Sequence, residues 1–297
     1  MGLSVATPAM RRRRRTGAWM RALVWLAALL AIIPLFAILG HLVVGGISAF
    51  TPALFVRMPA PAGVGGGGMA NAIVGTLVLL GIAALIGVPV GLGAGLFLAA
   101  NGRTRRAQTV RFVADVLSGL PSIVLGVFVW ELVVRPSGQF SALAGGIALG
   151  LLIIPVLARA TEELVKLVPT ALAESALALG FPEWRASLGI VLRTAMPGIA
   201  TAALVAMARA AGETAPLLFT AFGNPFFSTS LTRPISALPL QIYVYAGSAY
   251  EDWRAQAWAG AVVLLLLVAT MSLVARAVLR SRRSLMQGSA RAGSEEL

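Results

Sequence analysis

Arg209 and Glu213 are the two residues of this chain whose types and spacing point most directly to a binding chemistry. They lie in the otherwise apolar segment 208–221, where an ionised arginine within a membrane costs about 2.5–3.5 kcal/mol and therefore usually faces a polar cavity or a partner. A guanidinium donates two parallel hydrogen bonds to a tetrahedral oxyanion, and Thr214 can add a hydroxyl. Glu213 can pair with Arg209 if both share one helix face. The pattern predicts either a station for an anion or a structural clasp between helices.

A second pair, Arg159 and Glu162, stands three residues apart at the end of another apolar segment. This spacing allows an ion pair on one helix face. Arg159 can line a polar path, or it can extend its charged end to the membrane interface. We expect Asp115 and Glu131 to be interfacial or helix-terminal charges.

Several chemistries are excluded by residue type. Cysteine is absent and His41 is the only histidine, which excludes thiolate sites and removes most zinc and Ser-His-Asp sites. We therefore expect no metal site and no catalytic residues. The only lysine, Lys166, is followed by Leu167, so the chain has no P-loop and any bound ATP and magnesium would belong to a partner chain.

The composition is that of a membrane protein. Hydrophobic residues make up 58% and charged residues 12% of the 297 positions, against about 45–50% and about 25% in soluble domains. Apolar runs long enough to cross a bilayer recur along the chain. Six spans are predicted, over 23–44, 70–100, 112–134, 142–160, 196–221 and 257–279. A cleavable signal peptide is the alternative for the first span, because Arg11–Arg15 precede it.

Glycine and proline positions suggest how these spans are joined and packed. Residues 46–69 combine prolines with the glycine run 65–68, which favours a loop. Gly87, Gly91 and Gly95 are four residues apart, which predicts a face where another helix backbone approaches closely.

The basic residues set a prediction for the topology. Arg57, Arg135, Arg233 and Arg254 fall on one side of the predicted spans and Arg159 and Arg209 within them, which leaves the other 18 of 24 on the opposite side. The positive-inside rule then places both termini in the cytoplasm. The net charge of +13 is thereby explained without nucleic acid.

The cytoplasmic connection predicted at about 161–195 carries the next motif. It reads Glu174-Ser-Ala-Leu-Ala-Leu-Gly180, followed by Ile190-Val-Leu192. Small residues at Ser175 and Ala176 favour a slim helix, and Gly180 favours its end. The spacing resembles the EAA loop of binding-protein-dependent ABC importer permeases, in which the loop contacts an ATPase; here Ser175 replaces an alanine and Arg193 a proline. An ordinary surface helix is the alternative.

A closer resemblance covers residues 71–280. The segments that carry it are Asp115-Val-Leu-Ser-Gly-Leu-Pro-Ser-Ile-Val-Leu-Gly126, Lys166-Leu-Val-Pro169, 208–221 and Gln256-Ala-Trp-Ala-Gly260. They resemble the PstA-type permease subunits of phosphate-specific ABC importers. The resemblance implies an all-α, polytopic membrane protein with six transmembrane helices and the type I ABC importer (MetI-like) permease fold.

The same resemblance implies a set of partners and roles. The partners would be a second homologous permease subunit, a dimer of ATP-binding subunits and an extracytoplasmic phosphate-binding protein. Arg209, Glu213, Thr214, Arg159 and Glu162 would line the substrate path. Glu174, Ser175, Ala176 and Gly180 would couple to the ATPase.

This interpretation divides the chain into four parts in the inner membrane. They are a basic cytoplasmic arm (1–21), a first transmembrane helix with its extracytoplasmic loop (22–69), the permease domain (70–280) and a cytoplasmic tail (281–297). The outward loop 222–256, with Asn224, Pro225, Trp253 and the charges of 251–254, is either a docking surface for the binding protein or a solvated connection.

Three alternatives remain from the residues alone. The cargo can be another oxyanion or solute, since two arginines do not distinguish phosphate from sulfate. The chain can instead be an ion-coupled secondary transporter, or an enzyme acting on lipid, although its carboxylates are few and scattered.

Overall fold

The membrane-crossing helices of the computed structural model agree in number with the sequence prediction. The structure describes residues 8–102 and 104–292. In these ranges five helices are long and apolar enough to cross a bilayer, and six when one bent pair is counted as a single span. The outer ends of the predicted basic arm and tail, residues 1–7 and 293–297, lie outside the described residues, as does Arg103.

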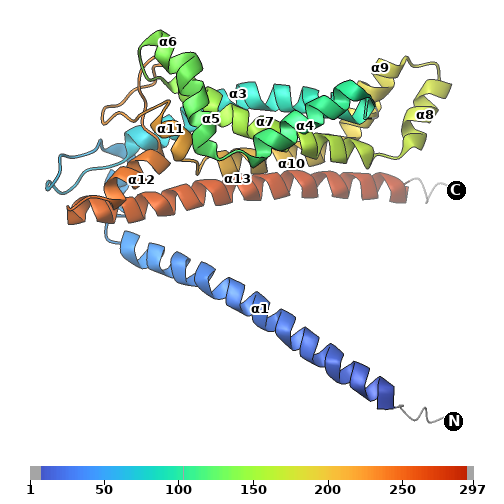
Figure 1. The fold of residues 1–297 in the computed structure, drawn as a ribbon, viewed down its shortest axis with the longest axis horizontal. Coiled ribbons are helices and arrows are strands. Elements are labelled where there is room, and N and C mark those ends of the chain that lie inside the picture. The colour runs from blue at the N-terminus through green and yellow to red at the C-terminus, as the bar shows by residue number, and fades with distance from the viewer. Residues whose placement is uncertain (1–7, 103, 293–297) are drawn as a thin grey trace.

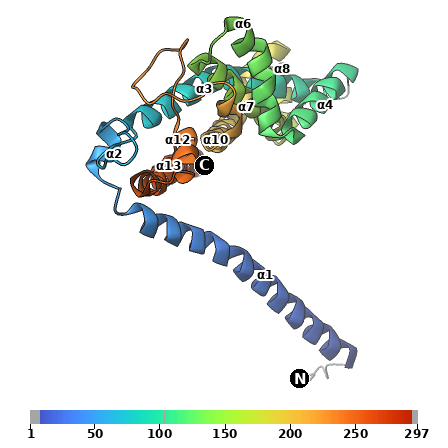
Figure 2. The ribbon, with the colours of Figure 1, turned by 60° about the vertical axis from the view of Figure 1, so that its left-hand side comes forward.

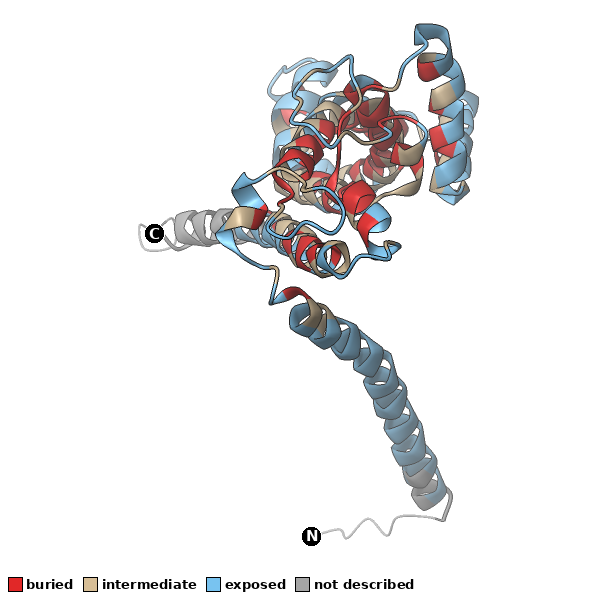
Figure 3. Cartoon of the chain, turned by 90° about the vertical axis from the view of Figure 1, so that its left-hand side faces the viewer, coloured by how far each residue is buried: buried red, intermediate tan, exposed pale blue. Residues whose placement is uncertain are grey.

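The centre of the bundle is the packing of α3 (Ala70–Ala100) against α7 (Ala142–Lys166), which share the most extensive helix contact of the fold. The predicted glycine face is confirmed. A Cβ atom added at Gly87 would lie 2.9 Å from the Gly150 carbonyl oxygen, and one at Gly95 would lie 2.4 Å from the Cβ of Thr161. The absence of side chains on this face lets the two backbones approach closely, and Figure 3 shows buried residues concentrated in this interior.

The third span, predicted over 112–134, is bent. It consists of α4 (Arg105–Gly119) and α5 (Ser122–Val129), which meet at 106°. The break follows from Pro121, which cannot donate a backbone hydrogen bond and disfavours helical geometry in the residue before it. Leu120 is accordingly extended, with φ −71° and ψ 138°.

Beyond α5 the span continues through a wide π-helical turn, η1 (Trp130–Val134), and the short α6 (Arg135–Ser137). Gly138 follows with φ 69°, a left-handed conformation that ends the helix. Ser141 then caps α7 by accepting a hydrogen bond from the Ala144 N–H at 3.1 Å.

The fifth span begins and ends earlier than predicted. It runs through α9 (Glu183–Arg185), the π-helical η2 (Ala186–Val191) and α10 (Leu192–Ala210). The predicted range of 196–221 was wrong because polar residues such as Arg185 and Arg193 lie inside the first helical turns. The predicted loop 161–195 therefore shrinks to the segment that holds α8 (Thr170–Ala178).

The last part of the chain returns across the bundle. After the four-residue α11 (Ala215–Leu218), the loop leads to α12 (Leu238–Ala246) and then to the long α13 (Glu251–Ala292). Thr76 joins α12 to α3, because its hydroxyl accepts a hydrogen bond from the Leu238 N–H at 2.8 Å.

The first helix, α1 (Pro8–Gly46), stands apart from the bundle. Figures 1 and 2 show it diverging from α13, with only its last turns in contact. His41 meets Trp258 edge to face at 5.0 Å, and Gly46 lies against the backbone of Ala259. Between α1 and α3 the chain forms the short α2 (Pro52–Val56).

The ends of the bundle differ in what they carry. In Figure 1 the start of α1, the end of α13 and helices α8 and α9 lie toward the right-hand end, while α6, α11 and α12 lie toward the left.

Candidate functional site

A cluster of paired charges, hereafter the paired cluster, joins α4 to α7. The fully buried carboxylate of Glu162 contacts three cations: Arg111 at 2.5 Å, Lys166 at 2.6 Å and Arg159 at 2.9 Å. The Nε of Arg159 also lies 3.3 Å from Asp115. Removing one partner from a buried ionic group leaves the others uncompensated. The geometry therefore gives Glu162 a structural role in holding the two helices together.

Sequence reasoning found part of this cluster. The predicted pair of Arg159 and Glu162 forms. The four-residue spacing from Glu162 to Lys166 was a signal for the second contact. Arg111 had no such signal, because its contact depends on how α4 packs on α7. Asp115 was predicted to be an interfacial or a helix-terminal charge; it lies within α4, four residues before its last, and pairs with Arg159.

A cavity of about 260 Å³ lies where the break in the third span faces α7 and α10. We call it the break cavity. Its lining comes from both sides of the break and from the two neighbouring helices, and comprises Leu117, Ser118, Leu120, Pro121, Ser122, Leu152, Pro155, Val156, Ala206, Arg209, Ala210 and Glu213.

The break cavity contains the strongest pair predicted from sequence, but not in the predicted arrangement. The helix ends at Ala210, so Arg209 and Glu213 do not share a helix face. Gly212 and Glu213 instead form a turn, with their N–H groups donating to the carbonyls of Arg209 and Ala210 at 3.1 and 3.2 Å. Pro216 lacks the N–H that would donate to the Gly212 carbonyl, so α10 cannot continue through it, and the short α11 begins there instead. In the part of the chain that the structure describes, no ion pair joins Arg209 to Glu213.

Two serines of the break cavity escaped the sequence prediction. Ser118 precedes the break and Ser122 follows it, and both line the same space as Arg209. Among the described residues, neither hydroxyl makes a hydrogen bond with protein. The Pro121 between them was the available signal, since it separates the helices that bring both hydroxyls to one cavity. Thr214 is half-buried at the start of α11 and does not line the cavity.

The paired cluster and the break cavity are neighbours along the same helices. Asp115 precedes the cavity residues of α4 by two or three positions, and Arg159 follows the nearest cavity residues of α7, Pro155 and Val156, by four and three. With a rise of about 1.5 Å per residue, this is about one helical turn. Both residues are displaced toward the end of the bundle that carries α8.

The predicted slim helix at 174–180 is present as α8, and its end is built as expected. Gly180 has φ 82°, and its N–H donates to the Leu177 carbonyl at 2.9 Å while the Phe181 N–H donates to that of Ala176 at 3.1 Å. This double closure is a Schellman motif, which favours glycine at the left-handed position. The helix therefore ends at a defined residue and reverses the chain.

The coupling candidates differ in their exposure. Glu174, Ser175 and Gly180 are exposed, whereas Ala176 is buried against the chain itself and presents nothing to a partner. Large apolar side chains surround the exposed face: Leu172, Leu177, Leu179, Phe181, Trp184 and Leu188. An exposed apolar patch of this kind on a projecting helix is typical of an interaction site.

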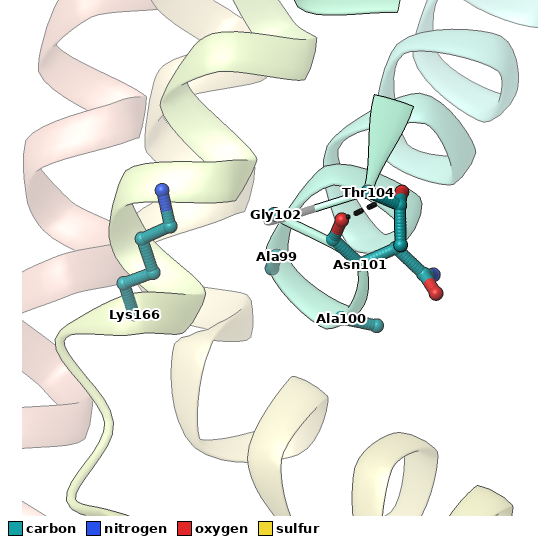
Figure 4. A pocket seen from close by; sticks show the side chains of 6 residues that line it. All are labelled: Ala99, Ala100, Asn101, Gly102, Thr104 and Lys166. Atoms are coloured by element: carbon teal, nitrogen blue, oxygen red, sulfur yellow. Dashed lines mark hydrogen bonds between the residues drawn. The ribbon is translucent and has the colours of Figure 1, made fainter. Parts of the chain in front are cut away.

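A second pocket, of about 540 Å³, opens beside the paired cluster. Figure 4 shows Lys166 on α7 facing the turn between α3 and α4, where the Thr104 hydroxyl donates to the Asn101 carbonyl at 2.9 Å. This places the ends of α3 and α7 and the start of α4 at the same end of the bundle as α8.

On the opposite end, part of the predicted docking surface is internal. Trp253 stacks on Tyr245 at 4.4 Å and donates to the Ala60 carbonyl, and Asn224 bonds to the carbonyl of Pro234. Among the charges of 251–254, Glu251 and Asp252 are exposed, and so is Pro225 in the loop that precedes α12. Across the described side chains, no group of three or more His, Asp or Glu residues is placed to hold a metal ion.

Comparison with known proteins gives the family of this arrangement. Residues 87–284, two thirds of the chain, match the model of the binding-protein-dependent transport system inner membrane component. The chain belongs to this family. It is thus a membrane component of a transport system, and the match spans the break cavity, the paired cluster and α8 together.

Individual relatives are also transport system permease proteins. The chain is 44% identical over 282 residues to the phosphate transport system permease protein PstA of Yersinia pestis, covering 92% of this chain and 96% of that one. It is 43% identical to the protein of the same name from Xylella fastidiosa, over 91% and 94% of the two chains. A probable PstA of Methanocaldococcus jannaschii is 36% identical, over 80% and 85%.

Solved structures support the fold. The MetNI methionine ABC transporter in an inward-facing conformation matches with a TM-score of 0.55 and 22% identity, over 70% of this chain and 91% of that one. An amino acid ABC transporter solved with histidines matches with a TM-score of 0.53 and 18% identity, over 72% and 93%. The fold is therefore that of ABC transporter permeases, as the sequence predicted.

Proposed function

We propose that this chain is the transmembrane permease subunit of an ATP-driven inorganic phosphate importer and forms half of its translocation path. The observation that carries the proposal is Arg209, an exposed arginine that lines a cavity between membrane-spanning helices and makes no ion pair with a carboxylate among the described residues. Such a side chain is free to bind an anion. The names of the relatives, phosphate transport system permease proteins, support phosphate as that anion.

In this proposal the anion meets the residues of the break cavity first. Arg209 binds it, and Glu213 lies beside it. Thr214 shapes the turn that follows Arg209. Arg159 comes next, about one helical turn closer to the α8 end, and Glu162 holds Arg159 in place. The anion would pass from Arg209 to Arg159 and remain within the helix bundle throughout.

The energy would come from a partner. The chain has no P-loop, so ATP and magnesium would bind to a dimer of ATP-binding subunits, and this subunit would perform no covalent chemistry. Helix α8 would fit a groove of that dimer through Glu174, Ser175 and the exposed apolar side chains around them. The buried Ala176 and the Gly180 turn would support α8 from behind.

The remaining partners follow from position. A second homologous permease subunit would complete the path, membrane lipid would surround the outer helices, and an extracytoplasmic phosphate-binding protein would dock at the end that carries α12. Both termini would be cytoplasmic, because the start of α1 and the end of α13 lie at the α8 end of the bundle and because the basic residues concentrate there.

The test of the function is reconstitution. Vesicles that contain the chain with the second permease, the ATPase and the binding protein should accumulate radiolabelled phosphate when ATP is supplied. The matched control is the same complex with the P-loop lysine of the ATPase replaced, which should not accumulate phosphate. Accumulation by this chain alone, without nucleotide, would favour an ion-coupled secondary transporter instead.

The orientation has its own test. Single cysteines at Gln139 and Gln108, both exposed and at opposite ends of the bent span, can be labelled in intact cells with an impermeant maleimide. Gln139→Cys should react from outside and Gln108→Cys only after the membrane is opened. The reverse pattern contradicts the topology. Ser141 is less suitable because it is buried and caps α7.

A further inference from the structure

We propose that the break cavity selects anions by whether they carry a proton, with Glu213 accepting a hydrogen bond from the anion while Arg209, Ser118 and Ser122 donate to it. This inference rests on the proposed function, because it names what the cavity recognises in phosphate. It assigns a specificity role to Glu213 and a binding role to two serines outside the pairs predicted from sequence.

The first step is the pairing of the acidic residues. Three carboxylates in the spans each contact an arginine: Asp115 contacts Arg159, Glu131 contacts Arg135, and Glu162 contacts Arg111 and Arg159. Glu163 and Glu183 make no ion pair among the described residues, but both are exposed and line no cavity with an arginine. Glu213 lines a cavity and has no such contact among the described residues. Glu213 is half-buried, so its carboxylate is partly removed from water and gains from a ligand that supplies a hydrogen-bond donor.

The second step is the set of groups that line the cavity. Arg209 can only donate hydrogen bonds, a carboxylate can only accept them, and the hydroxyls of Ser118 and Ser122 can do either. These four side chains come from α4, α5, the end of α10 and the turn after it, and they line one space of about 260 Å³. The remaining lining is apolar, so these four groups supply the side-chain hydrogen bonds to a ligand there.

The third step is the chemistry of the ligand. Phosphate and sulfate are tetrahedral oxyanions of similar size. Near neutral pH phosphate still carries at least one P–OH group, whereas sulfate carries none. Phosphate can therefore accept from Arg209 and the serines and donate to Glu213. Sulfate can only accept, so it would bring a negatively charged oxygen against the carboxylate.

The size of the effect follows from a lost charged hydrogen bond. Loss of one charge-assisted hydrogen bond weakens binding by about tenfold to a hundredfold. Because Arg209 and Ser118 are exposed and Glu213 is half-buried in this subunit, we expect the lower end of that range. The nearest other charges, Arg159 and Asp115, are already paired with each other about one turn away. They therefore do not change the expected preference for phosphate over sulfate. We therefore expect sulfate to bind the break cavity at least about tenfold more weakly than phosphate.

The experiment measures competition on the assembled complex of both permease subunits and the ATPase, without the binding protein, which makes its own selection. Radiolabelled phosphate is bound to the purified complex and displaced by arsenate, which carries a proton, or by sulfate. Arsenate should displace phosphate from the unaltered complex, and sulfate should need at least about a tenfold higher concentration.

The decisive variants are Glu213→Gln and Glu213→Ala, which remove the carboxylate in two ways, so that failure of one to assemble leaves the other. Both variants should reduce the ratio of the sulfate concentration to the arsenate concentration needed to displace phosphate, by about tenfold or more. Ser118→Ala and Ser122→Ala should weaken all three anions without changing their ratio. Glu163→Gln is the matched control, because Glu163 is exposed and lies outside the cavity.

The outcomes separate the inference from the function. An unchanged arsenate-to-sulfate ratio in both Glu213 variants, with ATP-driven phosphate uptake intact, overturns the inference and leaves the proposed function standing. Binding of sulfate as tightly as phosphate to the unaltered complex does the same. A complex that neither binds phosphate nor takes it up with ATP overturns both.

Discussion

Around Glu162 three cationic side chains enclose one buried carboxylate, whereas in the neighbouring break cavity Arg209 and Glu213 contact no opposite charge among the described residues. The residue types are the same in both places. The difference lies in burial and pairing: the paired cluster satisfies its charges internally, and the break cavity leaves its polar groups free. A charged residue in a membrane span is therefore assigned to structure or to binding by its contacts and not by its type.

The largest expected effect lies in the paired cluster. Glu162→Ala removes the charged hydrogen bonds that Arg111, Arg159 and Lys166 make to one buried carboxylate, each worth about 1.5–3 kcal/mol. Water compensates in part, because these cations are 24%, 37% and 47% exposed. We expect the variant to assemble poorly and to melt at a lower temperature in detergent. Glu163→Ala, the exposed neighbour, is the control and should melt as the unaltered protein does. An unchanged melting temperature in Glu162→Ala would remove the structural role of the cluster.

The second-largest effect is expected in the break cavity, where a substitution should reduce phosphate uptake and leave stability and assembly unchanged. Arg209→Ala removes charge-assisted hydrogen bonds to the anion, about 1.5–3 kcal/mol each, so phosphate uptake should fall at least about tenfold. Melting temperature and co-purification with the ATPase should not change, because Arg209 pairs with no carboxylate among the residues that the structure describes. Arg135→Ala, which breaks only an exposed surface pair, is the control for uptake. Loss of assembly in Arg209→Ala would make Arg209 a structural residue like those around Glu162.

A third, smaller effect tests the packing beneath the paired cluster. Gly95→Ala would place a Cβ atom 2.4 Å from that of Thr161, next to Glu162, and overpacking of this kind costs about 1–3 kcal/mol. We expect a lower melting temperature with weakened uptake. Gly93→Ala is the matched control, since nothing lies within 4 Å of its added Cβ atom. Equal melting of the two variants would show that α3 and α7 do not depend on this close approach.

The smallest expected effect on stability lies in α8, outside both regions. Gly180→Ala forces a side chain into a left-handed conformation, at about 1–2 kcal/mol, and should loosen the end of the helix without disturbing the bundle. We expect ATP hydrolysis to continue while less phosphate is transported per ATP. Gly189→Ala, in π-helical backbone with open space around it, should keep the normal ratio. A normal ratio in Gly180→Ala would argue against α8 as the coupling element.

The sequence was sufficient wherever a local rule decides the structure. Apolar length predicted the number of spans, the four-residue glycine spacing predicted the α3–α7 contact, and Gly180 predicted where α8 ends. Each depends on residues that are close in the sequence, so periodicity and backbone preference carry the information.

The sequence was insufficient where tertiary packing or a helix break determines which residues contact one another. Arg111 reaches Glu162 only because α4 lies on α7. The pairing of Arg209 with Glu213 was predicted on a helix that ends between them. Ser118 and Ser122 became visible as site candidates only once the 106° bend at Pro121 placed them on one cavity.

The short connections on either side of α8 have a mechanical consequence. Three residues, 167–169, separate α7 from α8, and four residues, 179–182, separate α8 from the helix that becomes α10. At no more than about 3.6 Å per residue, these links have little slack to absorb a displacement. Since α7 and α10 both line the break cavity, a displacement of α8 is transmitted to two of its walls at the same time.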